Sequence, residues 1–477
     1  MTRSASYILM WIRFVVVSMI CTLSPAVGRA QFSTEDVLTL EAFVDWVKKN
    51  HPMAKQSDLQ TVRGEAIVQT ARGSFDPKLW MDLDQKYFEE KQYYSHLDGG
   101  LKIPTWFGVE LNSGYEQNEG VFLDPENGTP GGGLLYAGVS LPLGQGLFID
   151  ERRAVLRKAR LMERATVEER KLMLNELVYE AGQSWYEWFK AYNALLIYQE
   201  ALDLAQFRFE AVKSTAALGD RPYIDTLEAG IQVQTRQFYL QQAQLELANA
   251  RARLSVHLWV DGIVPLEMEE RVLPPTSDKY PVAILPTELS LMDSVVNRHP
   301  ALNLYEYTID QYKIDRRWRA EQLKPVLDLQ YKPITEAVGS DPLAGYSPEN
   351  YKWGVGFSMP ILLRKERGYL KMTDVKINEA EFGLNMKEAE VVFKVQQYLN
   401  EYATTRDQIS LFTRTTVDVS ALLAGEREMF NNGESSLFMV NAREMTYIGA
   451  RVQLLEIQVK NAKSVLGASY AAGILGN

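Results

Sequence analysis

Two short stretches far apart in the chain share one alternating pattern. Gly138–Leu143 and Gly356–Ile361 each alternate small or polar residues with apolar ones up to a proline, and a long proline-free run follows each. Alternation of period two is typical of a strand with one apolar face. Proline fits at a strand's end because it cannot donate to the sheet ladder. Each stretch therefore predicts a strand that ends at Pro142 or Pro360 and leads into a long helix.

Apolar residues at seven-residue intervals follow the first of these strands. From 150 to about 214 there is no proline and one glycine, Gly182. The repeating positions, which predict a coiled-coil helix, are Leu174, Ala181, Trp188, Leu195, Leu202 and Phe209, with Val178, Trp185 and Tyr192 between them. At 1.5 Å per residue, such a helix is on the order of 100 Å long. After a reversal at 219–222 a second run extends to about 259, which predicts a helical hairpin.

The second half of the chain repeats this order. Pro52 and Pro77 are 25 residues apart, and so are Pro300 and Pro325, which indicates an internal repeat. Strands at about 326–360 then precede a hairpin that breaks near Gly433. From Pro77 to Pro142, however, the first repeat is 30 residues longer than the second from Pro325 to Pro360, about the length of one additional β-hairpin. The fold class predicted is α+β, with long helical hairpins and antiparallel strands.

These patterns divide the chain into four parts. The predicted division is a leader at 1–30, a first repeat at 31–260, a proline-rich linker at 261–286 and a second repeat at 287–477. Each repeat opens with a helix. The first then has strands at about 78–142 and a hairpin at about 150–259 with its tip near 219; the second has strands at about 326–360 and a hairpin at about 368–468 with its tip near 433.

The N-terminus has the pattern of a secretory signal peptide. Two arginines precede the apolar run Phe14–Leu23, and Gly28-Arg29-Ala30 predicts cleavage after Ala30. An uncleaved membrane anchor is the alternative. The only cysteine, Cys21, lies in this segment, so the mature chain would have no disulfide, thiolate metal site or cysteine nucleophile. No later stretch is apolar enough for a membrane helix, so any membrane insertion would be as a barrel.

Composition and motifs argue against catalysis and nucleic-acid binding. The 477-residue chain has a formal net charge of -10 and no basic block. Its four histidines, His51, His96, His257 and His299, are not spaced as a metal pair, and there is no phosphate loop or nucleophile elbow. We therefore predict no catalytic residue, no cofactor and no metal. The chain is expected not to be an enzyme.

Aromatic residues crowd both predicted strand regions, which leaves two interpretations. One is a soluble sheet with an aromatic core, and the other is a lipid-facing barrel with aromatic girdles. The signal peptide and the duplicated helices favour the barrel. Two repeats give four strands, or about six with the additional hairpin, fewer than the usual minimum of eight. Open sheet edges cannot be satisfied in lipid, so several copies would have to join, and their helices would form a conduit.

Over essentially its whole mature length the chain resembles the TolC family of bacterial outer-membrane efflux proteins. The matching features are the signal peptide, the duplicated strand and helix order, the strand Val139–Leu143 followed by Gly146, and the two hairpin tips beginning at Gly219 and Gly433. The resemblance implies a homotrimer, with a β-barrel in the outer membrane of a Gram-negative bacterium and an α-helical barrel in the periplasm. It also implies a periplasmic adaptor and an inner-membrane pump as partners of a passive exit duct for efflux or type I secretion.

In that family the hairpin tips close the channel and meet the adaptor. The residues that match are Gly219, Asp220, Arg221, Pro222, Asp225, Gly433, Glu434, Ser435, Ser436 and Phe438, and the strand-to-helix junctions are Pro142, Gly146 and Pro360. Each glycine is also explained by a helix-terminating turn. Some relatives carry an aspartate ring after the second tip; here those positions are Met439 and Ala442, and the nearest acids are Glu434 and Glu444. The competing hypothesis is a structural or adhesive coiled-coil surface protein without a conducting pore.

Overall fold

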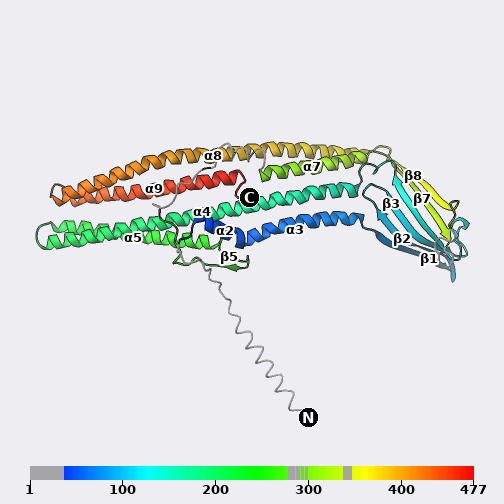
Figure 1. Ribbon diagram of the computed structural model, residues 1–477, viewed down its shortest axis with the longest axis horizontal. Coiled ribbons are helices and arrows are strands. Elements are labelled where there is room, and N and C mark those ends of the chain that lie inside the picture. Colours follow the sequence, from blue (N-terminus) through cyan, green and yellow to red (C-terminus); the bar gives the residue numbers. More distant parts are fainter. Residues whose placement is uncertain are drawn as a thin grey trace, which may run out of the picture. The chain divides into compact units, whose positions relative to one another are not determined.

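A computed structural model describes residues 37–277, 285, 291, 295, 299–336 and 346–476 (Figure 1). The predicted leader with Cys21 lies outside these residues, as do 278–284 and 286 of the predicted linker. The chain divides into two compact units. The helical unit comprises Met1–Asp58, Lys171–His299 and Val391–Asn477, and the sheet unit comprises Leu59–Arg170 and Pro300–Glu390.

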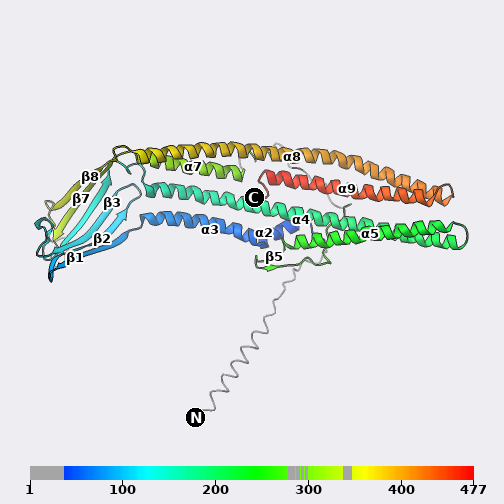
Figure 2. The ribbon, with the colours of Figure 1, turned by 180° about the vertical axis from the view of Figure 1, so that it is seen from behind.

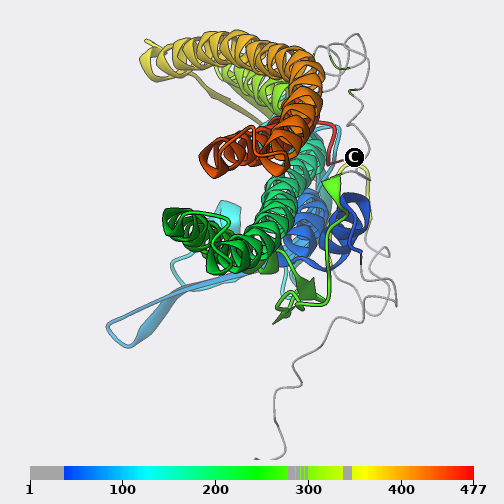
Figure 3. The same cartoon turned by 90° about the vertical axis from the view of Figure 1, so that its left-hand side faces the viewer.

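Long helices make up most of the described chain. Their bounds are α2 Leu40–Asn50, α3 Pro52–Arg72, α4 Glu151–Ala217, α5 Tyr223–Ser255, α7 Pro300–Glu321, α8 Arg364–Asn431 and α9 Leu437–Ala471. Proline opens both α3 and α7, a position where its missing N–H costs no hydrogen bond. Figure 3, which faces the tips, shows α4 with α5 and α8 with α9 as two helical hairpins. None of the helices among the described residues combines the length and the apolar character that crossing a membrane would require.

The sheet unit contains one six-stranded antiparallel sheet (Figure 2). Its strands, in spatial order, are β1 Lys78–Phe88, β2 Lys91–Pro104, β3 Glu110–Glu119, β4 Leu134–Pro142, β7 Val326–Glu336 and β8 Tyr351–Ser358. β2 and β3, which pair as an antiparallel hairpin, lie in the part of the chain where the first repeat is longer than the second. Leu141 pairs with Leu329 where β4 meets β7, which joins strands from both halves of the chain. A separate small hairpin, β5 Trp259–Val260 and β6 Val264–Pro265, belongs to the helical unit.

The two edge strands of the sheet expose apolar side chains at alternate positions. On β1, Leu79 is 85% exposed, and Met81 and Leu83 continue the same face. On β8, Phe357 is 69% exposed, and Trp353 and Val355 continue its face. Among the described residues β1 and β8 each pair on one side only. The sheet therefore has two open edges and uncovered apolar side chains on both.

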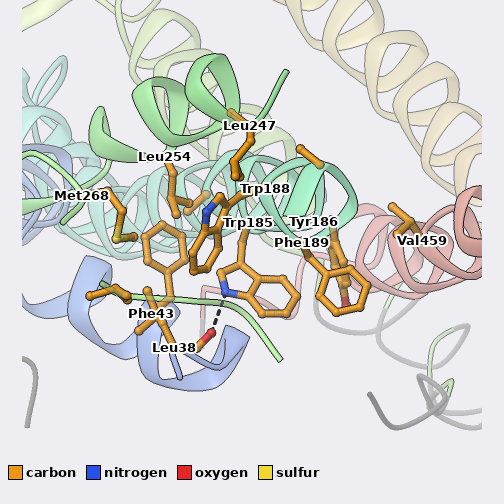
Figure 4. Packing of buried hydrophobic residues seen from close by; sticks show 14 of the residues in the cluster. Leu38, Phe43, Trp185, Tyr186, Trp188, Phe189, Leu247, Leu254, Met268 and Val459 are labelled. Atoms are coloured by element: carbon orange, nitrogen blue, oxygen red, sulfur yellow. Dashed lines mark hydrogen bonds between the residues drawn. The ribbon is translucent and has the colours of Figure 1, made fainter. Parts of the chain in front are cut away.

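The core of the helical unit is built on the heptad positions of α4. Trp185 and Trp188 are fully buried, together with Phe43 of α2 and Leu254 of α5 (Figure 4). The Trp185 indole N–H donates to the carbonyl oxygen of Leu38 at 3.2 Å, which satisfies the polar atom of a buried ring. The predicted seven-residue pattern is thus confirmed as a packing seam, and this seam holds the hairpin of α4 and α5 in place.

Candidate functional site at the tips of the helical hairpins

The first tip is a tight helix-ending turn centred on Gly219. Its φ is +85°, a left-handed conformation that glycine adopts without a Cβ clash. The Gly219 N–H donates to the carbonyl of Ala216 at 3.1 Å, and the Asp220 N–H donates to that of Thr215 at 3.1 Å. These two bonds form a Schellman motif, which satisfies carbonyls left open at the end of α4. The helix-terminating interpretation of Gly219 is therefore confirmed.

The second tip has the same geometry. Gly433 has a φ of +80° and donates to Phe430 at 3.1 Å, while the Glu434 N–H donates to the carbonyl of Met429 at 2.9 Å. Ser436 then caps α9, since its side chain accepts from the Met439 N–H at 3.3 Å. Both tips therefore have the same type of turn, a positive-φ glycine closed by two backbone hydrogen bonds.

The side chains of the predicted tip residues differ in their surroundings. Arg221 approaches Asp225 to 3.8 Å, and Pro222 precedes the first residue of α5. Ser435 donates to the Glu426 carboxylate, which holds the second turn against α8. Phe438 is 66% exposed. Asp220 and Glu434 are exposed as well. The tips therefore present both acidic and apolar groups to solvent.

Contacts near the turns join one hairpin to the other. The Arg221 guanidinium lies over the Phe430 ring at 4.1 Å, a cation–π contact between the first turn and α8. Val212, Ala229 and Leu437 form a small buried cluster, contributed by α4, α5 and α9. The structure therefore brings the two predicted tips together within the helical unit.

A buried charge cluster lies behind these contacts, and sequence reasoning did not find it. Glu444 of α9 has a side chain only 3% exposed. Arg208 of α4 donates to both of its oxygens at 2.8 Å, and Arg427 of α8 donates to one at 3.2 Å. Arg208 also donates to Asn441 at 2.9 Å. We call Arg208, Arg236, Arg427, Asn441 and Glu444 the tip charge cluster.

Arg236 of α5 is the least satisfied member of the tip charge cluster. Its side chain is 2% exposed, and its Nη2 atom is 3.9 Å from Glu444, beyond hydrogen-bond distance. Neither Nε nor Nη2 has a hydrogen-bond partner, and Nη1 contacts the sulfur of Met445. Burial lowers the pKa of Arg236, while Glu444 acts in the opposite direction. The Glu444 carboxylate is thus within ion-pair distance of three arginines, Arg208, Arg236 and Arg427.

A sequence signal for this cluster does exist. The buried residues of α5 include Ala229, Arg236, Ala243 and Ala250, which follow one another at seven-residue intervals. Arg236 therefore occupies a seam position where an apolar residue is the rule. Glu444 follows the buried Leu437 by seven residues on α9. A charged residue in each of two seams indicates a buried ion pair, although it does not identify the partners. Of the two acids nearest the second tip, Glu434 is exposed and Glu444 is buried.

The two strand-to-helix junctions use different turns. After Pro142, Gly146 has a φ of +92°, and Arg153 donates to its carbonyl and to that of Leu147. Asp150 caps α4, accepting from the Arg153 N–H at 2.8 Å. Between Pro360 and the start of α8 there is no glycine, and Leu363 takes a φ of +48° directly before the helix. Both junctions order the backbone between a strand and the helix that follows it.

The histidines outside the tips include one close pair, which lies in the helical unit. His51 and His257 are neighbours, with ring centroids 5.9 Å apart, and the Nδ1 atom of His51 accepts from the Met53 N–H at 3.1 Å. Burial, and then the neighbouring His51, lower the pKa of His257 to about 4. Across the described ranges no three histidine, cysteine or acidic residues are grouped so that they could hold a metal ion.

Comparisons with known proteins identify the fold. The CmeC outer membrane channel of Campylobacter jejuni is 13% identical, with a TM-score of 0.63 over 94% of this chain and 91% of that chain. The open-state MtrE outer membrane channel of Neisseria gonorrhoeae is 14% identical, with a TM-score of 0.65 over 91% and 88%. The outer membrane protein VceC of Vibrio cholerae is 12% identical, with a TM-score of 0.65 over 91% and 96%.

Comparison with models of protein families and with the sequences of curated proteins finds no match. The likeness is therefore one of structure, and it extends over more than nine tenths of the chain in each of the three cases. The chain has the fold of these outer-membrane channels, the fold that its resemblance to the TolC family implies.

Proposed function

We propose that this protein is the outer-membrane exit duct of a tripartite efflux or type I secretion system in a Gram-negative bacterium. The structural likeness to outer-membrane channels over nine tenths of the chain supports this assignment. The predicted signal peptide also supports it, because such a peptide directs export from the cytoplasm. The protein would conduct its substrates passively, with the energy supplied by an inner-membrane pump. Since its structural neighbours are channels, the protein is expected to have no catalytic activity.

The observation that carries the proposal is the sheet with two open, apolar edges. A soluble sheet would cover residues such as Leu79 and Phe357, yet both are mostly exposed. Alternating apolar residues on an uncovered face are typical of strands that face lipid. In lipid the unpaired amides of β1 and β8 would each cost several kcal/mol, as a rule about 4–8 per group without a partner. The edges must therefore meet those of further copies.

A homotrimer is the assembly that we infer. Three copies would join β8 of one protomer to β1 of the next and close a β-barrel in the outer membrane. The helical hairpins would follow the same symmetry and form an α-helical barrel in the periplasm. A periplasmic adaptor would dock on the tips around Gly219 and Gly433.

The tip charge cluster gives the duct a means of staying closed. Arg208 on α4 binds both oxygens of Glu444 on α9, so charge-assisted hydrogen bonds hold the two hairpins together, while Arg427 on α8 holds the same carboxylate from within the second hairpin. A tip that opens must separate or hydrate these groups. We therefore propose that the cluster stabilises the closed state of the tips and that adaptor docking releases it.

Fractionation and reconstitution test the proposal against the structural or adhesive alternative. The duct is expected in outer membranes, as a detergent-stable trimer by light scattering, with discrete conductance steps in planar bilayers. A monomer that stays soluble without detergent and forms no conductance would refute the duct and support the alternative.

Cross-linking tests the tips directly. Because the mature chain is expected to lack cysteine, Asp220→Cys and Glu434→Cys would introduce the only two thiols beside the tip glycines. Oxidation should abolish export, and a reductant should restore it, whereas each single variant should export normally in both conditions. Unchanged export with the cross-link verified on gels would count against gating at the tips.

A further inference from the structure

A cavity of about 390 Å³ lies beside the tip charge cluster, between α4, α8 and α9. It is entirely within the helical unit. Its lining residues are Leu204, Phe207, Arg208, Ala211, Val212, Thr215, Arg221, Arg427, Phe430, Asn431 and Val440. Its size lies in the range typical of small-molecule sites.

The charged lining of this cavity has a single sign. Among the described residues that line it, the charged side chains are Arg208, Arg221 and Arg427, and no carboxylate belongs to the lining. The three arginines differ in how many hydrogen bonds their guanidinium groups already make. Arg208 is committed to Glu444 and Asn441. The cavity is therefore an electropositive recess whose remaining donors come from Arg221 and Arg427.

Arg221 and Arg427 have donors to spare. A guanidinium carries five N–H donors. Arg427 makes one hydrogen bond, to Glu444, and its side chain is 40% exposed. Arg221 reaches Asp225 only at 3.8 Å, longer than a hydrogen bond. Both lie close to Phe430, since Arg221 stacks on its ring and Arg427 is three residues before it on α8.

The other walls of the cavity are mainly apolar. Leu204 of α4 is partly exposed and Phe207 of α4 largely so, and the buried Val440 of α9 also lines the cavity. An apolar group placed here would cover surface that now faces water, at about 25 cal/mol per Å². An electropositive group of donors next to an apolar wall matches a ligand with an anionic head and an apolar body.

We propose that this cavity binds a small apolar carboxylate. The carboxylate would accept hydrogen bonds from Arg221 and Arg427, and the apolar body would lie against Leu204, Phe207 and Val440. Glu444 is shared by three arginines, two of which line the cavity. Two further carboxylates adjoin the region, Asp225 beside Arg221 and Glu228 beside Asn441, but neither lines the cavity, so an anion in the cavity would meet the arginine side chains directly. The site does not depend on whether the protein conducts.

Three probes of nearly equal shape and different charge test the proposal: phenylbutyrate, phenylbutanol and phenylbutylamine. Each is titrated calorimetrically into the full-length assembly in detergent, with empty micelles as the blank. Phenylbutyrate is expected to bind at least about tenfold more tightly than phenylbutanol, since hydrogen bonds to charged groups contribute about 1.5–3 kcal/mol. Phenylbutylamine should not bind. Equal affinity for acid and alcohol, or no saturable binding of the acid, would overturn the site.

Variants locate the binding. Arg221→Gln is expected to weaken phenylbutyrate about tenfold while leaving phenylbutanol unchanged, and Phe207→Ala should weaken both. Arg451→Gln is the matched control, because Arg451 pairs with Glu200 on the surface and does not line the cavity. If Arg221→Gln and Arg451→Gln bind the acid equally well, the ligand lies elsewhere and the proposal fails. Circular dichroism of each variant verifies that its helices are intact.

Discussion

Replacing Glu444 with glutamine should open the tips. Glutamine keeps the size of the side chain and one acceptor oxygen, but it removes the carboxylate that Arg208, Arg427 and Arg236 share. In the variant, three arginines would remain together in a site where Arg208 and Arg236 are largely buried, without a counterion. Separation of the hairpins would let water solvate them. The closed state therefore loses free energy relative to the open one.

The magnitude follows from the burial of the pair. Removing one partner of a buried ion pair costs about 3–5 kcal/mol, whereas an exposed pair is worth about 0–1 kcal/mol. Glu444 is 3% exposed and bound by both nitrogens of the Arg208 fork, so the larger range applies. A shift of about 3 kcal/mol changes the ratio of closed to open tips by roughly two powers of ten.

Single-channel recording in planar bilayers measures this ratio. Glu444→Gln should raise the open probability by up to about a hundredfold, and Glu200→Gln, which breaks only the surface pair with Arg451, should leave it unchanged. Arg236→Met should lower the open probability or leave it as it is, because it removes a buried cation that lacks two hydrogen-bond partners. Equal open probability and equal thermal stability of Glu444→Gln and wild type would refute the reasoning.

Three further predictions concern stability. Gly219→Ala and Gly433→Ala should each cost about 1–2 kcal/mol in urea unfolding, since both positions have positive φ and open space for a Cβ, and asparagine should be better tolerated than alanine at either. Because the pKa of His257 falls from 6.5 to about 4 on folding, the unfolded chain binds more protons between these values. Thermal stability should therefore be complete above about pH 6.5 and fall as pH drops towards 4, with a flatter profile for His257→Gln. Trp185→Ala should cost about 3–5 kcal/mol through the cavity it leaves, measured by the same urea titration.

The long helices could be predicted because their signals are local. The proline-free stretch from 150 matches α4, Glu151–Ala217, and the heptad residues Trp185 and Trp188 are buried as the seam requires. The turn at Gly433 was equally visible, since a helix that must reverse needs a residue with positive φ. The extra length before Pro142 gave the additional hairpin. The helix and the turn need only neighbouring residues, whereas the hairpin required a comparison of the two repeats.

The start of α8 could not be placed in the same way. The sequence predicts that the second hairpin begins at about 368, whereas α8 starts at Arg364. Its first turn contains Lys365, Glu366 and Arg367, charged residues that carry no apolar periodicity. What fixes the start is the positive φ of Leu363 and the hydrogen bond from the Arg367 N–H to its carbonyl. A non-glycine residue in that conformation leaves no signature in the sequence.

The tip charge cluster lay beyond sequence reasoning for a deeper reason. Arg208, Arg236, Arg427 and Glu444 come from four different helices, and no local pattern says which charges meet. The seam positions of Arg236 and Glu444 indicate only that each must be buried. A buried charge without a partner is costly, so a buried arginine and a buried glutamate are expected to pair with each other or with other charges. The fold meets this need by placing arginines of both hairpins around the Glu444 carboxylate. Three arginines share the Glu444 carboxylate, so two nitrogens of Arg236 have no hydrogen-bond partner, and Arg208 and Arg427 also line the neighbouring cavity. The proposed closure of the tips and the proposed anion site therefore depend on the same group of charges.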